Sequence, residues 1–167
     1  MDLYLVRHGV AYNADAKRWP DDRDRPLTPA GEKRFQRAAR GLARVAPSVD
    51  RVLSSPLSRA WRTAELLASD AKWPKPVVCQ PLEPGGTPAG VLLAVQGHGR
   101  ALAVALVGHE PSMHELVSYL LTGDTRQLQV EFRKGGVARL EIGEGLRPGT
   151  ARLVWLLAPK VLRGLGG

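Results

Sequence analysis

The chain has 167 residues, 44% hydrophobic and 24% charged, which is the composition of one globular domain, and we expect a single domain over residues 1–167. Its single cysteine, Cys79, excludes an internal disulfide. The N-terminal residues lack the pattern of a signal peptide and no apolar run approaches 18 residues, so the expectation is a cytoplasmic protein with no membrane partner.

The formal net charge is +8, but the basic residues are scattered along the chain. Aromatic residues make up only 5% of the chain, and none interleave with a basic run. Because proteins that bind nucleic acid combine basic surfaces with stacking aromatics, we expect no nucleic-acid partner. The charge either steers an anionic substrate or reflects an arginine-rich composition without function.

Short apolar runs alternate with helical patterns along the first 121 residues. Thr28-Pro29 and Thr87-Pro88 each supply a hydroxyl cap followed by a proline, which is typical of a helix start. The predicted strands cover residues 2–7, 51–53, 76–79 and 101–107, and the predicted helices cover 29–46, 55 to about 69, a stretch after 88, and 111 to about 121. This alternation predicts βαβ units, and hence an α/β three-layer sandwich with a largely parallel central sheet flanked by helices.

The C-terminal part changes character. Residues 127–133, 136–142 and 151–157 read as three further strands, and the last two could form a hairpin. We therefore expect an antiparallel edge of the sheet near the C-terminus.

Three polar segments directly follow predicted strands. They are Arg7-His8-Gly9, then Ser54-Ser55-Pro56 leading to Arg59, and Gly108-His109-Glu110. In open α/β sheets, ligands bind outside the carboxyl ends of the strands. The sequence therefore predicts that His8, His109, Arg7 and Arg59 gather at one rim of the sheet.

Such a set suits phosphoryl chemistry. The guanidinium fork matches phosphate oxygens, and a neutral imidazole can attack phosphorus and carry the phosphoryl group. Neighbouring guanidinium charges should lower the pKa of the attacking histidine, which keeps it unprotonated near neutral pH.

These segments, with RPLTPAG at 25–31, SSPLSRAWRTA at 54–64 and VGHEP at 107–111, resemble the histidine phosphatase superfamily, whose signature is an R-H-G after the first strand. The resemblance implies that His8 is the phosphorylated nucleophile and that Arg7, Arg59 and His109 complete the phosphate pocket. It implies no metal and no organic cofactor. The short chain and FRKGG at 132–136 are most similar to the SixA group, described as phosphohistidine phosphatases.

Many relatives also have an acidic residue in the middle region that protonates an alkoxide leaving group. Here that region reads CQPLEPGGTPAG, where Glu83 is the only carboxylate and thus the candidate general acid. An imidazole leaving group, with a pKa of about 6.5 against about 15.7 for water, needs less help. The pattern therefore favours a histidine-phosphorylated protein as partner. A broad phosphatase for small esters and a non-catalytic module that binds phosphorylated ligands stay open, and the sequence fixes no oligomeric state.

Other charged residues have simpler explanations. Arg62 shares a helix face with Arg59 and is expected to be solvated or paired, and His98 is expected in an exposed turn. His114 follows His109 by five residues rather than the four of a helical zinc pair. Three aspartates interleave with arginines in the loop 10–25, which favours a solvated loop beside the pocket over a metal site; they are Asp21, Asp22 and Asp24.

Overall fold

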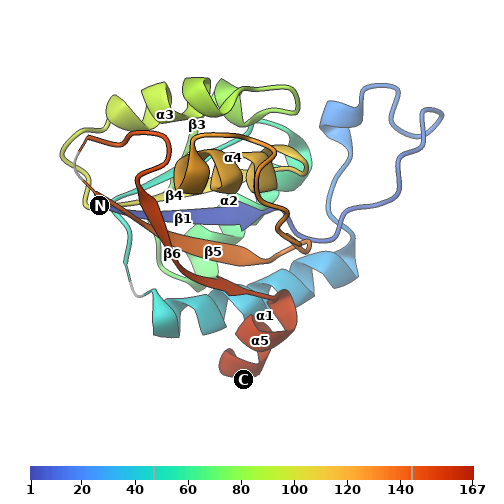
Figure 1. Ribbon diagram of the computed structural model, residues 1–167. Helices are drawn as coiled ribbons and strands as arrows, with labels where there is room; N and C mark the ends of the chain where they lie inside the picture. Colours follow the sequence, from blue (N-terminus) through green and yellow to red (C-terminus); the bar gives the residue numbers. More distant parts are fainter. Residues whose placement is uncertain (47, 144) are drawn as a thin grey trace.

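The computed structural model describes residues 1–46, 48–143 and 145–167. Its sheet has six strands in the order β3-β2-β4-β1-β5-β6 (Figure 1). They are β1 (Asp2–Arg7), β2 (Arg51–Ser54), β3 (Pro76–Val78), β4 (Ala103–Gly108), β5 (Val137–Ile142) and β6 (Ala151–Leu157). The first four run parallel, whereas β5 pairs antiparallel with β1, and β6 antiparallel with β5. The predicted parallel sheet, antiparallel edge and C-terminal hairpin are confirmed.

Helices cover both faces of this sheet. They are α1 (Pro29–Val45), α2 (Ser58–Asp70), α3 (Pro88–Gln96), α4 (Ser112–Thr122) and α5 (Pro159–Leu165), with short 3-10 turns η1 (Asp22–Asp24) and η2 (Gln80–Leu82). One core cluster joins α1, α2 and α5 to the sheet, and a second joins α3 and α4 to the opposite face. The predicted three-layer α/β sandwich is therefore confirmed (Figure 1).

The central strands are buried on both sides because alternate residues serve the two core clusters. In β1, Tyr4 and Val6 face the α1 layer, while Leu3 and Leu5 face the α4 layer. All four side chains are buried. A strand covered by helices on both faces reads as a continuous apolar run, which explains the plain strand signal of residues 2–7.

The predicted caps of two helices are confirmed. The hydroxyl of Thr28 accepts a hydrogen bond from the Gly31 N–H, and that of Thr87 accepts one from the Gly90 N–H. The second helix differs: α2 begins at Ser58 rather than Ser55. The Ser55 hydroxyl accepts from the Leu57 N–H instead, which keeps residues 55–57 outside the helix, between β2 and α2.

The strand predicted over 127–133 is wrong. This segment carries no regular structure and pairs with no strand. The Ser118 hydroxyl holds it, since it accepts from the Leu128 N–H and donates to the Asp124 carbonyl. Farther along, Phe132 is buried and its carbonyl accepts from the Arg7 guanidinium at 2.5 Å. The apolar residues of this segment therefore anchor it to the core, and its backbone bonds Arg7 rather than a neighbouring strand.

The helix α5 was not predicted. It has seven residues and two glycines at or near its C-terminus, Gly164 and Gly166, so its local helix signal is weak. It packs closely against α1, where a Cβ on Gly41 would lie 1.8 Å from the Leu162 carbonyl oxygen. The close approach that Gly41 permits, rather than local propensity, stabilises this helix.

Within the described ranges, no helix combines the length and the apolar character that a membrane span requires.

Candidate active site

The four predicted pocket residues lie together at the carboxyl ends of three neighbouring strands. A histidine follows each of β1 and β4. Because the two strands pair with Arg7 opposite Gly108, these histidines, His8 and His109, are neighbours. The ring centroids of His8 and His109 are 5.2 Å apart. Arg59 enters from the first turn of α2, which follows β2. His8, Arg59 and His109 are buried, at 6%, 4% and 2% exposure.

The His8 ring is held in one tautomer by the backbone. Its Nδ1 lies 2.7 Å from the Gly9 carbonyl oxygen, which can only accept, so Nδ1 carries the proton. The Nε2 lone pair is then available for attack. Burial first, and then the charges of His109, Arg59 and Arg7, lower the pKa of His8 to about 3, against the opposing bond to Gly9. The ring is therefore neutral near pH 7.

A serine orients the second histidine. The His109 Nε2 lies 2.9 Å from the Ser55 Oγ, which also accepts from the Leu57 N–H. The proton of that hydroxyl can be donated to Nε2, and the proton of the neutral His109 ring is then on Nδ1. This Nδ1 is buried and has no hydrogen-bond partner among the described residues. Burial, followed by the charge of Arg59, lowers the pKa of His109 to about 3. His109 thus offers one free N–H as a neutral donor to a phosphoryl oxygen.

The two arginines are fixed by backbone carbonyls and keep donors unused. Arg7 donates through Nη1 to Phe132, and Arg59 donates through Nη1 to the Asp22 carbonyl at 2.8 Å. The Nε atoms of both are buried without a partner in the described part of the chain. Burial is the main cause that lowers the pKa of each guanidinium. Two partly desolvated cations with free donors form a site for a multiply charged oxyanion.

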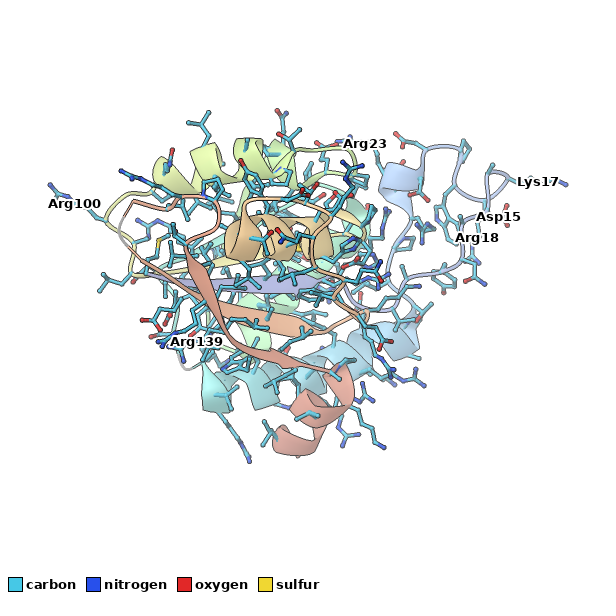
Figure 2. All side chains as sticks on the ribbon, viewed as in Figure 1. Asp15, Lys17, Arg18, Arg23, Arg100 and Arg139 are labelled. Carbon is cyan, nitrogen blue, oxygen red and sulfur yellow. The ribbon has the colours of Figure 1, made fainter. Side chains whose placement is uncertain are left out.

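The loop 10–25 lies beside this pocket, as expected. The carboxylate of Asp22 is 3.1 Å from Arg59 Nη2 and also pairs with Arg25, and these contacts hold its pKa below its usual range. The loop projects from the body of the molecule, with Asp15, Lys17 and Arg18 at its tip (Figure 2). Asp22 occupies donors of Arg59 that a phosphoryl group could take.

Backbone contacts brace the turn that carries His8. The Gly9 N–H donates to the Thr63 hydroxyl at 3.0 Å, and that hydroxyl donates to the Arg59 carbonyl at 2.7 Å. From the other side, the Gly135 N–H donates to the carbonyls of Arg7 and His8. Gly135 has a φ of +79°, which the turn needs and which an L side chain adopts only with strain. The KGG part of residues 132–136 thus fixes the turn that carries His8.

Glu83, the predicted general acid, follows η2 near the end of β4. Its carboxylate is ion-paired with Arg23 of the projecting loop, and 22% of its side chain is exposed. The pair connects the loop 10–25 to the segment before α3. Glu83 is therefore engaged in an ion pair. Its role as a general acid stays a prediction.

Glu110 was named only as part of the segment after β4 and was not predicted to have a role in the pocket. Its Oε2 accepts from His114 Nδ1 at 2.7 Å, whereas its Oε1 is buried with no described partner. Burial raises the pKa of this carboxyl, against the opposing effects of His114 and Arg7. Its position directly after His109, at the end of a buried strand, was the signal that could have found it. His114 is accounted for by this contact rather than by a metal.

The remaining candidates lie outside the pocket. Arg62 pairs with Glu32 and Glu65, as the simpler interpretation expected. Among the residues that the structure describes, no group of three or more His, Cys, Asp and Glu side chains is placed to hold a metal ion.

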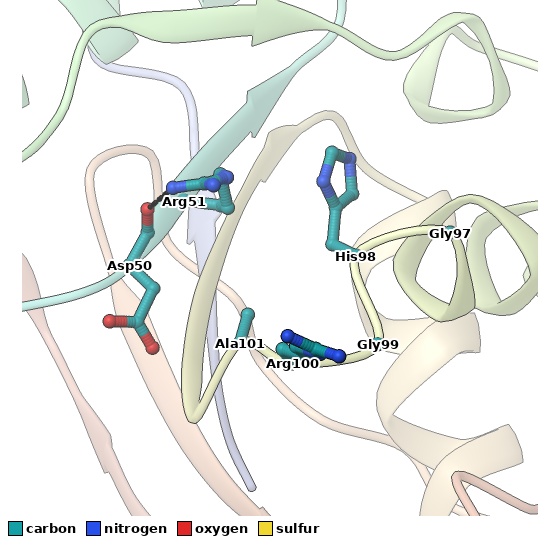
Figure 3. A pocket seen from close by; sticks show the side chains of 7 residues that line it. All are labelled: Asp50, Arg51, Gly97, His98, Gly99, Arg100 and Ala101. Atoms are coloured by element: carbon teal, nitrogen blue, oxygen red, sulfur yellow. Dashed lines mark hydrogen bonds between the residues drawn. The ribbon is translucent and has the colours of Figure 1, made fainter.

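A separate hollow of about 430 Å³ lies at the opposite end of the parallel strands, where Asp50, Arg51, His98 and Arg100 line it (Figure 3). His98 is partly buried in its turn rather than exposed. The Asp50 carboxylate accepts from the N–H groups of Leu102 and Ala103. Asp50 therefore holds the chain at the start of β4, and this hollow has no part in the pocket.

Comparisons with known proteins agree with this geometry. The profile of the histidine phosphatase superfamily (branch 1) matches residues 3–81. An uncharacterized protein from Picosynechococcus sp. is 38% identical over 156 residues, covering 92% of this chain and 88% of that protein. The structure of the protein histidine phosphatase SixA complexed with tungstate is 27% identical, with a TM-score of 0.83, and covers 97% of this chain and 99% of that one.

Structures of phosphatases with other substrates share the fold. A phosphoserine phosphatase mutant from Entamoeba histolytica is 16% identical, with a TM-score of 0.67, and covers 96% of this chain and 98% of that one. This likeness concerns the fold alone. The profile match, the similarity to SixA and the R-H-G motif after β1 agree, and the chain belongs to the histidine phosphatase superfamily.

Proposed function

We propose that this protein is a phosphatase that removes the phosphoryl group from phosphohistidine on a protein through a phosphorylated His8. The observation that carries the proposal is the buried, neutral His8 ring, with its Nε2 free and with Arg7, Arg59 and His109 around it. The similarity to SixA over nearly the whole chain supports the substrate class.

The proposed reaction has two steps. In the first, the Nε2 lone pair of His8 attacks phosphorus, the P–N bond of the substrate breaks, and the leaving imidazole nitrogen takes up a proton. In the second, water attacks the phosphoryl group on His8, the new P–N bond breaks, and phosphate leaves with release of one proton. The two steps together consume only water.

The pocket residues stabilise charge during both transfers. Arg7 and Arg59 bind the equatorial oxygens, and the free Nδ1–H of His109 donates to one of them. Phosphoryl transfer depends mainly on positioning and on electrostatic stabilisation in a desolvated site, which these residues supply. In this scheme a phosphoryl oxygen replaces the Asp22 carboxylate at Arg59.

The leaving group decides between the two open substrate classes. An alkoxide needs a proton donor, and the predicted donor Glu83 is ion-paired with Arg23. An imidazole, whose pKa is about 6.5, leaves with far less assistance. The paired state of Glu83 thus favours phosphohistidine over small phosphate esters, which stay the alternative.

The test compares two substrates under one condition. Turnover of a phosphohistidine-bearing protein and of an aryl phosphate is measured in EDTA with wild type, His8→Ala and His98→Ala. The last is a matched control, because His98 lies at the far end of the sheet. We expect wild type and His98→Ala to prefer the phosphohistidine protein, and His8→Ala to lose both activities by at least 1000-fold, on the order of what removing a covalent nucleophile costs.

Each contrary outcome removes a different part of the proposal. If wild type prefers the aryl phosphate, the substrate class is wrong while the nucleophile stands. If His8→Ala keeps full activity, the nucleophile is wrong.

A further inference from the structure

A second hollow, of about 80 Å³, lies beside the turn that carries His8, and Gly9 and Val10 of this turn line it. It is bounded by the first turns of α1, by the turn at residues 134–135 and by the start of α5. Phe35, Ala38 and Pro159 form apolar walls, and Gly9, the residue after the nucleophile, contributes to the lining. The helices α1 and α5 lie against each other at this place (Figure 1).

This hollow is positively charged. Its lining includes three cationic side chains, Arg34, Lys134 and Arg163, and no carboxylate. Within the described part of the chain, none of the three forms an ion pair, whereas several other arginines are paired with acids. Three uncompensated cations around one concave site create a potential that attracts an anion.

Lys134 connects the hollow to the phosphate pocket. Lys134 is an exposed residue, and the partial desolvation of its ammonium group, followed by the charges of Arg7, Arg25 and Arg59, lowers its pKa. The same side chain lines the hollow with Arg34 and Arg163. Gly9, next to His8 in the chain, also lines this hollow, so an anion bound there would lie near a phosphoryl group on His8.

We propose that this hollow binds the carboxylate of an acidic side chain close to the phosphorylated residue of a substrate protein. The inference rests on the proposed function and deepens it. The volume suits one small group rather than a ring or a nucleotide. The guanidinium forks of Arg34 and Arg163 match a carboxylate, and the apolar walls suit the methylene groups that carry it. These walls favour an acidic side chain over a second phosphate.

The test uses two phosphohistidine peptides that differ only in their flanks, one carrying Asp and Glu and the other Asn and Gln. We expect kcat/KM of wild type to be about tenfold higher for the acidic peptide, mainly through KM, as one charge-assisted hydrogen bond would give. This ratio should fall with added salt. In Arg34→Ala and Arg163→Ala the ratio should approach one.

A matched control excludes a general effect of charge. Arg44 is an exposed arginine on the same helix, near its far end and outside the hollow. Arg44→Ala should keep the wild-type ratio. An acidic-to-neutral ratio near one in wild type, or an unchanged ratio in both hollow variants, would overturn the inference. A peptide with a second phosphate that is preferred over the acidic peptide would overturn the assignment to a carboxylate.

Failure of the proposed function gives a different result. In that case wild type hydrolyses an aryl phosphate and neither peptide. The hollow is then tested by fluorescence anisotropy with the unphosphorylated acidic peptide. Tighter binding to wild type than to Arg34→Ala, by about the same factor, supports the hollow, and equal binding overturns it.

Discussion

Two adjacent buried serines differ in their relation to the pocket. Ser54, the last residue of β2, and Ser55, which follows it, are both fully buried. The Ser54 hydroxyl donates to the Ser55 carbonyl, whereas the Ser55 hydroxyl bonds His109 Nε2. Only Ser55 therefore determines which nitrogen of His109 carries the proton, so it is a positioning residue rather than a catalytic one.

Ser55→Ala should lower kcat about tenfold with a smaller change in KM, because the loss of one buried hydrogen bond frees the tautomer and orientation of His109. Ser54→Ala, which removes an equally buried hydroxyl one residue away, should stay within about twofold of wild type. Steady-state kinetics on an aryl phosphate and on a phosphohistidine protein measure this. An equal loss in both variants would assign the effect to packing.

At the scale of residues, the sequence predicted the groups that follow buried strands. His8, His109, Arg7 and Arg59 could be placed at one rim because parallel strands end at the same edge. Glu110 and Lys134 could not be weighed in this way. The interest of Glu110 comes from its buried carboxyl oxygen, and both residues lie in the neighbourhood of Arg7, which depends on tertiary contacts that the spacing of the chain does not reveal.

At the scale of elements, local signal and distant contacts again explain what could be predicted. Two predictions failed: the strand expected over 127–133 is absent, and the helix α5 was missed. Strands buried on both faces carry their own signal, so β1 and β4 could be predicted with nearly their observed bounds. The segment 127–133 imitates a strand, but its polar backbone is satisfied by Ser118 and Arg7. The helix α5 has little local signal and is stabilised through Gly41 of α1. Contacts distant in sequence decided both cases.

Two glycines should respond in opposite directions to alanine. A Cβ on Gly41 would meet the Leu162 carbonyl oxygen at 1.8 Å, so Gly41→Ala must displace α5 and should cost about 1–3 kcal/mol of folding free energy. Gly164, inside α5, has open space within 4 Å, and Gly164→Ala should stabilise by up to about 1 kcal/mol. Urea unfolding midpoints check both. A neutral Gly41→Ala would contradict the close packing of α1 and α5.

At the scale of the whole molecule, the site makes folding depend on pH. His8 and His109 are buried and neutral, and burial lowers the pKa of each to about 3, against about 6.5 in an unfolded chain. Between these values the unfolded chain binds more protons than the folded one. The stability that this difference contributes is fully present above about pH 6.5 and is lost as the pH falls toward 3.

The other groups with shifted pKa values change folding stability in a different pH range or in the opposite direction. Asp22, Asp50 and Glu141 have lowered pKa values, so they also lose stability on acidification, but below the ordinary pKa of a carboxyl group, near 4. Glu110 has a raised pKa, so its protonation favours the folded state as the pH falls. Between about pH 6.5 and 5 the two histidines therefore dominate the loss.

The free energy of unfolding should fall between pH 7 and pH 5 by about 1 kcal/mol per pH unit for each histidine. Urea denaturation at fixed ionic strength measures this slope. His8→Asn and His109→Asn should each remove about half of it, whatever they do to stability at pH 7. Ser54→Ala, which removes a buried hydroxyl but no titratable group, should keep the wild-type slope. A stability that stays constant from pH 7 to 5 would mean that the two rings titrate alike in the folded and unfolded chains, and a stability that rises over this range would mean that they are already protonated in the folded protein. The second result would also remove the neutral nucleophile on which the proposed phosphoryl transfer depends.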